Sequence, residues 1–200
     1  MADGDNGVTW LDRVRRGEHF EMPDPTLIAD LIKTRALVDR FNALPVSEFD
    51  QRTELMRQFF GKVGTNVLVM PGLNMDVGVN ISIGNDVFIN VNSTFLAAFP
   101  VTIGNGVAMG PSVMIMASGH PPRAADRKRR DPVTGQTKEV TIGAPIVIGD
   151  DVWIGAGVIV LPGVTIGARC TIGAGSVVTK SIPPDMLAYG NPCRPVRSLA

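Results

Sequence analysis

Thr141 to Ser181 reads TIGAPIVIGDDVWIGAGVIVLPGVTIGARCTIGAGSVVTKS, and in this stretch one aliphatic residue returns at every sixth position. The recurring residues are Ile142, Ile148, Ile154, Val160, Ile166, Ile172 and Val178. A period of six matches neither an α-helix nor the alternation of a strand. It is typical of a triangular coil in which short strands alternate with tight turns and the repeated side chain points inward. We therefore predict an all-β solenoid of hexapeptide repeats.

A β-sandwich of apolar strands is the alternative fold. Its strands would be separated by turn signals about every 8–12 residues, whereas the six-residue phase runs unbroken from Thr141 to Ser181. A single coil cannot bury its own apolar face, so it must stack on its neighbours. The solenoid is the favoured interpretation.

The same phase extends upstream with two interruptions. The expected inward residues are Val77, Ile83, Ile89 and Phe95, and then, after a shift near Pro100, Ile103, Met109 and Ile115. From Ile115 the next in-phase residue, Ile142, is 27 positions away where six suffice, so about 21 residues must leave the coil as a loop. We place this extruded loop at residues 119–140.

Helical patterns precede the solenoid. Thr9 is expected to cap a short helix, and Asp24 followed by Pro25 is expected to open a second helix that runs to about Asn42. The apolar face predicted for the second helix consists of Leu27, Ile28, Leu31, Ile32, Ala36, Leu37 and Phe41.

A third helix is expected from Ser47 to Gly61, because Ser47 can serve as its N-cap and glycine ends it. The sequence thus divides into three parts. They are an N-terminal helical appendage at residues 9–61, a solenoid at 62–182 and a C-terminal tail at 183–200.

The composition excludes several classes of protein. The 200 residues include 19 basic and 19 acidic side chains, so no net charge indicates a nucleic acid or a membrane surface as partner. No apolar run is long enough to span a bilayer. The first ten residues lack the basic and apolar regions of a secretory signal, and the two cysteines have no motif spacing. We expect a cytoplasmic protein.

His120 is one of two histidines, and it stands at the base of the long excursion. A histidine beside glycine and proline is more often a turn residue than a base, but a position on a rigid stem favours a functional role. A zinc hydratase of the γ-carbonic-anhydrase type would need about three convergent histidines. Only His19 remains, in the helical segment, so no metal site is expected.

Several motifs, taken together in their order, resemble one family. They are RRGEHF and the helix ending RFN, NISIGNDVFIN, SGHP, VTIGAPIVIGDDVWIGAGVIVLPGVTIG, and GAGSVVTKSIPPDMLAYGNPCRPVR. From residue 9 to about 198 the chain resembles the hexapeptide-repeat O-acetyltransferases of the maltose, galactoside and nodulation acetyltransferase type. The resemblance implies a left-handed parallel β-helix and a homotrimer with each active site between two subunits. It also implies transfer of acetyl from acetyl-CoA to a hydroxyl of a sugar or sugar-like small molecule.

The resemblance assigns roles to individual residues. His120 is implied to be the general base, a role that contributes about 10²–10⁴ in rate. Asn90 matches an asparagine that borders the acetyl group and the acceptor, although asparagine also simply fills turns. The Ala156 N–H is implied to bind the oxyanion, and Trp153 to wall the thioester or to pack in the trimer. Further positions implied to line CoA are Ala174, Thr179, Lys180, Arg194 and Arg197, and for the cations a solvated tail is the alternative.

The acceptor side departs from the family pattern. Phe88 stands where a tyrosine is expected, Ala98 stands where an acidic residue is expected, and Asp76 keeps a polar acceptor position. Because a polyhydroxyl ligand is selected by paired polar contacts, we expect an acceptor that is less polar, or differently arranged, than maltose or a galactoside.

The loop after His120 carries a run of basic residues. They are Arg123, Arg127, Lys128, Arg129 and Arg130. The favoured interpretation is a solvated loop, and the alternative is attraction of an anionic acceptor or of the CoA phosphates.

Two other functions stay open at this point. One is a xenobiotic O-acetyltransferase that acts on an antibiotic hydroxyl. The other is a catalytically silent trimeric scaffold, because the fold alone does not establish activity.

Overall fold

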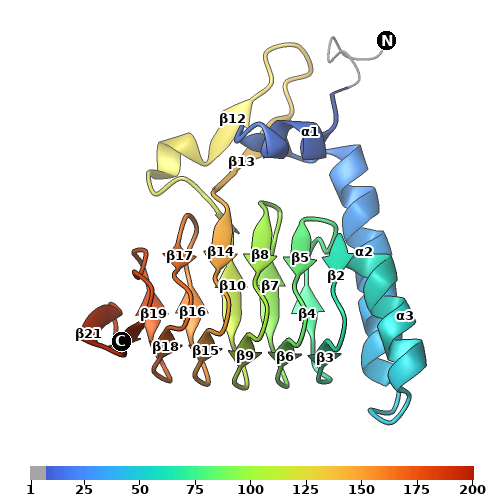
Figure 1. Ribbon diagram of the computed structural model, residues 1–200. Coiled ribbons are helices and arrows are strands. Elements are labelled where there is room, and N and C mark those ends of the chain that lie inside the picture. The colour runs from blue at the N-terminus through green and yellow to red at the C-terminus, as the bar shows by residue number, and fades with distance from the viewer. Residues whose placement is uncertain (1–7) are drawn as a thin grey trace.

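The computed structural model describes residues 8–200, and its main body is a prism with three β-sheets as its faces (Figure 1). Sheet I contains β2 (Lys62–Val63), β5 (Ile81–Ile83), β8 (Val101–Ile103), β14 (Ile146–Ile148) and β17 (Thr165–Ile166). Sheet II contains β3 (Leu68–Val69), β6 (Phe88–Ile89), β9 (Ala108–Met109), β15 (Trp153–Ile154), β18 (Thr171–Ile172), β20 (Met186–Tyr189) and β21 (Arg194–Ser198). Sheet III contains β4 (Asn74–Met75), β7 (Thr94–Leu96), β10 (Met114–Met116), β16 (Ile159–Val160) and β19 (Val177–Val178). The predicted solenoid is confirmed.

The six-residue repeat marks the inward positions, as predicted. The buried members are Ile83, Ile89, Phe95, Ile103, Met109, Ile115, Ile148, Ile154, Val160, Ile166, Ile172 and Val178. Fully burying one such side chain contributes about 1.5–3 kcal/mol, so the stacked columns account for much of the stability of the prism. The assignment of Ile142 was wrong. It is half-buried and lies in β13 (Thr137–Gly143), outside the coils, where it pairs with Gly119.

The irregularities of the repeat all fall at the corner where the chain passes from sheet III to sheet I, here called the III–I corner. Ile81 pairs with Val101, 20 residues later, whereas Val147 pairs with Thr165, 18 residues later. The early coils therefore carry two additional residues, and these lie at the III–I corner. Val77 is buried, as predicted, but it follows β4 at this corner.

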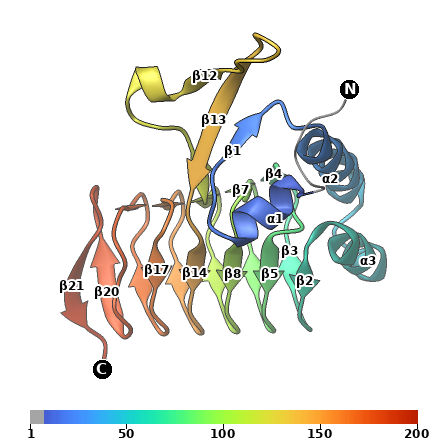
Figure 2. The same ribbon diagram turned by 90° about the horizontal axis from the view of Figure 1, so that it is seen from above.

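The long excursion leaves the prism at the III–I corner and folds as an antiparallel sheet (Figure 2). Its elements are β11 (Ser118–Gly119), the 3₁₀ turn η1 (Ala124–Asp126), β12 (Lys128–Arg130) and β13. Ser118 pairs with Gly143, so the ladder extends beyond residues 119–140 on both sides. β13 also pairs with β1 (Phe20–Met22), a strand that the sequence did not predict. The excursion is thus joined to the N-terminal segment.

Three helices form the N-terminal segment: α1 (Trp10–Arg15), α2 (Pro25–Ala43) and α3 (Phe49–Phe59). The predicted caps of the first two are confirmed, because the side chains of Thr9 and Asp24 accept hydrogen bonds from backbone N–H groups of the first turns. The third helix begins at Phe49 without a side-chain cap, not after Ser47.

The predicted apolar face of α2 is only partly correct. Leu27 and Phe41 are buried as expected, but Ile32 is 66% exposed, and Thr34 and Val38 are buried instead. The buried residues of α2 are those at positions 27, 34, 38 and 41, because α2 packs against both α3 and β4, the first strand of sheet III.

Two polar side chains join the helices to the first coil. Arg52, 2% exposed, donates to the carbonyl oxygens of Phe41, Leu44 and Val69, and its guanidinium lies 3.9 Å from the centroid of the Phe41 ring. Asn42 donates to the Leu73 carbonyl and accepts from the N–H groups of residues 72 and 73. The helical segment is therefore fixed on the end of the prism.

The C-terminal residues continue sheet II, because β20 pairs with β18 and then folds back on β21. The range 183–200 therefore contains a β-hairpin and not only a tail. Within residues 8–200, no helix is both long and apolar enough to cross a membrane.

Candidate active site

His120 follows β11 at the point where the excursion leaves the prism, and its ring has a defined orientation. Nδ1 lies 2.9 Å from the carbonyl oxygen of Val140 on β13. A carbonyl oxygen can only accept, so Nδ1 carries a proton, and in the neutral imidazole Nε2 then keeps its lone pair. This arrangement suits a general base, because the ring is held by one nitrogen while the other is available to a substrate.

The backbone around His120 is held by Arg127. Its Nε donates to the carbonyl oxygen of Pro121 at 2.9 Å, and its Nη2 donates to that of Pro122 at 2.8 Å. The N–H of Val140 donates to the Arg127 carbonyl oxygen at 2.9 Å. Arg127 therefore links the residues after His120 to the strand that orients the imidazole, a role that its place in a basic run did not indicate.

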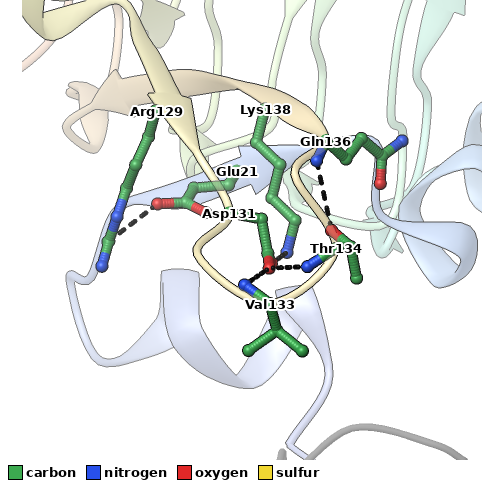
Figure 3. A network of polar contacts seen from close by, with 7 residues as sticks. All are labelled: Glu21, Arg129, Asp131, Val133, Thr134, Gln136 and Lys138. Carbon is green, nitrogen blue, oxygen red and sulfur yellow. Dashed lines mark hydrogen bonds and ion pairs between the residues drawn. The ribbon is translucent and has the colours of Figure 1, made fainter.

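Further polar contacts stabilise the turn between β12 and β13 and join β12 to β1 (Figure 3). Asp131 accepts from the N–H groups of Val133 and Thr134, and Lys138 lies 3.3 Å from it. The N–H groups of Thr134 and Val133 lower the pKa of Asp131 to about 2. Arg129 pairs with Glu21 of β1 at 3.0 Å. The basic run is exposed, as expected, but Lys128, Arg129 and Arg130 form β12 of a hydrogen-bonded sheet and not an irregular loop.

A cavity of about 550 Å³ opens beside His120 on the outer face of sheet III. Its lining residues are His19, Met114, Met116, Ser118, Gly119, His120, Ile142, Gly143, Ala144, Ile159, Leu161 and Pro162. Both histidines of the chain therefore line one cavity, although His19 was assigned to the helical segment alone. The pairing of β1 with β13 brings it there, and no local pattern in the sequence signals a contact so distant along the chain.

A metal at this cavity is not indicated by its donors. Two histidines fall short of the three protein ligands that a catalytic zinc ion usually has. Across residues 8–200, histidine, cysteine and carboxylate side chains form no cluster of three or more.

Most of the other predicted site residues lie at two different corners of the prism. Asp76, Ala98, Thr179 and Lys180 follow strands of sheet III, so they share the III–I corner with His120. Asn90, Ala156 and Ala174 follow strands of sheet II, at what is here called the II–III corner. Phe88 and Trp153 stand on sheet II in one column, because each pairs with Ala108. Within one chain, sheet III separates His120 from Asn90 and Ala156.

Asp76 lies in a separate cavity of about 360 Å³ between α2 and sheet III. Its Oδ1 accepts from the N–H groups of Val77 at 2.6 Å and Ala97 at 2.7 Å. Burial raises the pKa of Asp76, and the hydrogen bonds from Ala97 and Val77 oppose that shift. Ala98 is only 5% exposed, and its carbonyl oxygen accepts from Asn80 at 2.8 Å.

Asn90 has a structural role and one donor group to spare. Its Oδ1 accepts from the Val91 N–H at 2.8 Å, and its carbonyl oxygen accepts from Ser93 Oγ at 2.9 Å. These contacts are those of a turn residue. Among the described residues, Nδ2 makes no hydrogen bond, so this amide group can reach a ligand at the II–III corner.

Ala156 presents its backbone N–H at the same corner. The residue is exposed, and no hydrogen bond within residues 8–200 uses this N–H. A Cβ on Gly110 would lie 2.7 Å from the Ala156 nitrogen, so glycine at 110 leaves the N–H uncovered. The same relation joins Gly155 to the Ala174 nitrogen at 2.6 Å. Close stacking of the coils therefore requires glycine at positions such as 110 and 155. The uncovered N–H of Ala156 follows from this requirement.

The predicted cofactor cations are exposed. Lys180 follows β19, while Arg194 and Arg197 lie on β21, where Arg194 Nη1 donates to the Cys193 carbonyl oxygen at 2.7 Å. Trp153 is also exposed, at 58%. A large apolar ring on the surface of one chain is what a ligand or a second subunit would cover.

Comparison with known proteins decides the family. Residues 13–64 match the model of the maltose acetyltransferase hexapeptide capping motif, and residues 145–180 match that of the bacterial transferase hexapeptide repeats. Galactoside O-acetyltransferase of Escherichia coli K12 is 37% identical over 188 residues, which are 94% of this chain and 88% of that protein. The chain belongs to the hexapeptide-repeat O-acetyltransferase family.

Solved structures agree with this assignment. The crystal structure of a maltose O-acetyltransferase from Clostridium difficile 630 has a TM-score of 0.88 and 37% identity, and it covers 98% of this chain and 100% of its own. A galactoside acetyltransferase in complex with coenzyme A has a TM-score of 0.85 and 37% identity, covering 94% and 90%. The expected left-handed parallel β-helix with an N-terminal helical appendage is confirmed.

Proposed function

We propose that this O-acetyltransferase moves the acetyl group of acetyl-CoA to a hydroxyl of a small-molecule acceptor, with Nε2 of His120 as the general base. The hydrogen bond from Nδ1 to Val140 carries the proposal, because it fixes the tautomer that a base needs. The hydroxyl proton moves to Nε2 as the oxygen attacks the thioester carbon. The C–S bond then breaks, and the imidazolium returns the proton to the leaving CoA sulfur.

We propose that the complete site forms between two subunits of a homotrimer. His120 and Lys180 lie at the III–I corner of one subunit, and Asn90 and Ala156 lie at the II–III corner. A threefold arrangement of prisms would set the first corner of each subunit against the second corner of its neighbour. The free Ala156 N–H would then face the thioester, and a single oxyanion donor of this kind is worth about 3 kcal/mol.

The cofactor in this proposal is acetyl-CoA, and the residues of the chain fit it. Lys180, Arg194 and Arg197 offer exposed cations for the phosphates, with Thr179 and Ala174 beside the arm. Trp153 would cover the thioester end. A thioester is already an activated acyl group, so the mechanism requires no metal.

A cytoplasmic location is part of the proposal. Cys170 and Cys193 are both buried and unpaired, as is usual in a reducing compartment. Burial raises the pKa of each thiol, which disfavours the reactive thiolate.

Thiol release from acetyl-CoA, followed with DTNB over a panel of acceptors, tests the function. We expect His120→Ala to lower the rate at least about a hundredfold, with the KM for acetyl-CoA little changed, because the base acts mainly in the transition state. His120→Gln is the matched variant, since it keeps a side-chain donor for Val140 but has no base. Near-normal turnover in both variants would remove His120 from the mechanism.

The same acceptor panel separates the remaining alternatives. A silent scaffold would release no thiol with any acceptor. An antibiotic O-acetyltransferase would prefer chloramphenicol or a streptogramin to mono- and disaccharides. Because the cavity beside His120 is lined mainly by apolar side chains, we expect weak activity on maltose and on simple galactosides.

A further inference from the structure

His19 is brought to the cavity of His120 by a well-anchored backbone. The next residue, Phe20, is 4% exposed and pairs with Thr141 of β13. The Phe20 ring stacks on Phe99 of the III–I corner at 6.1 Å and meets Trp10 edge to face at 6.2 Å. With its neighbour fixed on two sides, His19 has a defined place on the cavity wall.

The two imidazoles of the cavity are not equivalent. His120 is oriented by its bond to Val140, whereas His19 makes no hydrogen bond within residues 8–200. A general base must be held in place before reaction, and that requirement selects His120. The His19 ring is exposed and keeps both nitrogens for a ligand.

The remaining wall offers little else that is polar. Ser118 is the only other polar side chain that lines the cavity, and the large side chains are Met114, Met116, Ile142, Ile159 and Leu161. Apolar walls with a few placed polar groups bind a largely apolar ligand and fix its orientation. A ligand with many hydroxyls would leave most of them without partners.

We propose that His19 is a specificity-determining residue that hydrogen-bonds a second oxygen of the acceptor while His120 takes the proton of the first. The acceptor is then a compact, mainly apolar molecule with a reactive hydroxyl and a neighbouring oxygen. This inference rests on the proposed role of His120. It also supplies a polar contact to the acceptor in a chain where Phe88 and Ala98 stand in place of polar residues of the family pattern.

A matched pair of small alcohols measures this contact. Cyclohexanol and trans-1,2-cyclohexanediol differ by one hydroxyl, and the diol has a twofold statistical advantage from its two equivalent hydroxyls. We expect wild-type kcat/KM to favour the diol by about three- to tenfold beyond that factor, which is the range of one net hydrogen bond. In His19→Leu the preference should fall to the statistical factor, with the KM for acetyl-CoA unchanged.

Two further variants serve as controls. His19→Gln keeps a donor and an acceptor, so it should retain part of the diol preference. Glu18→Gln alters the neighbouring residue, which does not line the cavity, and should behave as wild type. An unchanged diol preference in His19→Leu would overturn the inference. A change confined to the KM for acetyl-CoA would also overturn it, because His19 would then contact acetyl-CoA and not the acceptor.

Imidazole NMR signals give a second measurement that needs no turnover of the probes. The chain has only two histidines, so His19→Leu and His120→Ala assign both signals. Saturating diol in the presence of CoA should shift both signals, and cyclohexanol should shift that of His120 alone. A His19 signal whose chemical shift does not change when the diol is added refutes the inference. Turnover that survives His120→Ala instead refutes the proposed function, so the two failures are distinguishable.

Discussion

Glu21 on β1 lies directly opposite Val140 on β13, and Val140 is the residue whose carbonyl oxygen orients His120. The N-terminal helical segment and the proposed catalytic base are therefore connected through one strand pair. The ion pair between Glu21 and Arg129 reinforces it, but Arg129 is exposed and Glu21 only half-buried, so the pair is worth about 1 kcal/mol or less. The ladder and the packing of Phe20 carry most of the connection.

Phe20→Ala should therefore weaken both the fold and the activity. Removing a buried phenylalanine costs about 3–5 kcal/mol, and the loss falls on the strand next to Val140. We expect a lower melting temperature and a lower kcat with little change in the KM for acetyl-CoA. Val133→Ala is the matched control, because Val133 is 90% exposed at the tip of the same sheet. Equal kcat in the two variants would show that β1 does not support His120.

The coils could be predicted from the sequence because the pattern that specifies them is local. An inward residue such as Ile154 is specified by a six-residue period that needs no knowledge of the remaining fold. β1 escaped prediction for the opposite reason. Its three residues carry no periodicity of their own, and their strand conformation comes from pairing with Thr141, more than a hundred positions away. The exposure of Ile32 shows the same limit, since tertiary packing decided which face of α2 is buried.

The proposed site was predictable only in part for the same physical reason. His120 could be recognised because it begins the one excursion from a regular scaffold. Its partner Val140 and the nearby His19 could not, because a backbone carbonyl carries no sequence signal and the β1–β13 contact is non-local. The family resemblance supplied Asn90 and Ala156, but the separation of these residues from His120 by sheet III required the fold.

Asp76→Asn should stabilise the protein at neutral pH. Burial raises the pKa of this carboxyl group above its unfolded value, so the ionised form is disfavoured in the folded state. Stability should then fall as pH rises from the unfolded pKa through the folded pKa. Asparagine keeps an oxygen for the N–H groups of Val77 and Ala97 and removes the charge.

Melting curves between pH 3 and pH 8 measure this effect. Relative to Asp76→Asn, the wild type should lose stability over the interval that begins near the ordinary aspartate pKa, about 3.9. The difference between the two proteins should level off above the folded pKa. Asp86→Asn serves as the control, because Asp86 is exposed and, within residues 8–200, its carboxylate accepts a hydrogen bond only from Asn66. A lower melting temperature for Asp76→Asn at pH 7 would mean that the ionised carboxylate has a favourable partner in the assembly.

Restoring the polar residues of the family pattern should succeed at one position and fail at the other. Phe88 is half-buried on the outer face of sheet II, so Phe88→Tyr can place its hydroxyl at the surface. Ala98 is 5% exposed, and a carboxylate there would be buried without a charge partner. Such a change costs several kcal/mol or forces the group to be protonated. We expect a normal melting temperature for the first variant and a marked decrease for Ala98→Asp, with Ala98→Ser intermediate. An unaltered melting temperature for Ala98→Asp would show that this position opens to solvent or to ligand in the assembly.

Complementation between inactive subunits tests whether the site is shared. Asn90→Asp keeps the oxygen that accepts from Val91 but loses the Nδ2 donor, so it should damage the II–III corner without disturbing the turn. His120→Ala damages the III–I corner.

Each proposed site takes its III–I corner from one subunit and its II–III corner from the next. A site is therefore intact only when the first subunit carries Asn90→Asp and the next carries His120→Ala. Random assembly of equal amounts makes about one quarter of the sites intact in a cyclic oligomer. Refolding the two variants together should therefore restore about a quarter of wild-type activity, with native mass spectrometry confirming mixed trimers. Mixed trimers without activity would place both corners in the site of a single chain, whereas full activity of Asn90→Asp alone would remove Asn90 from the site.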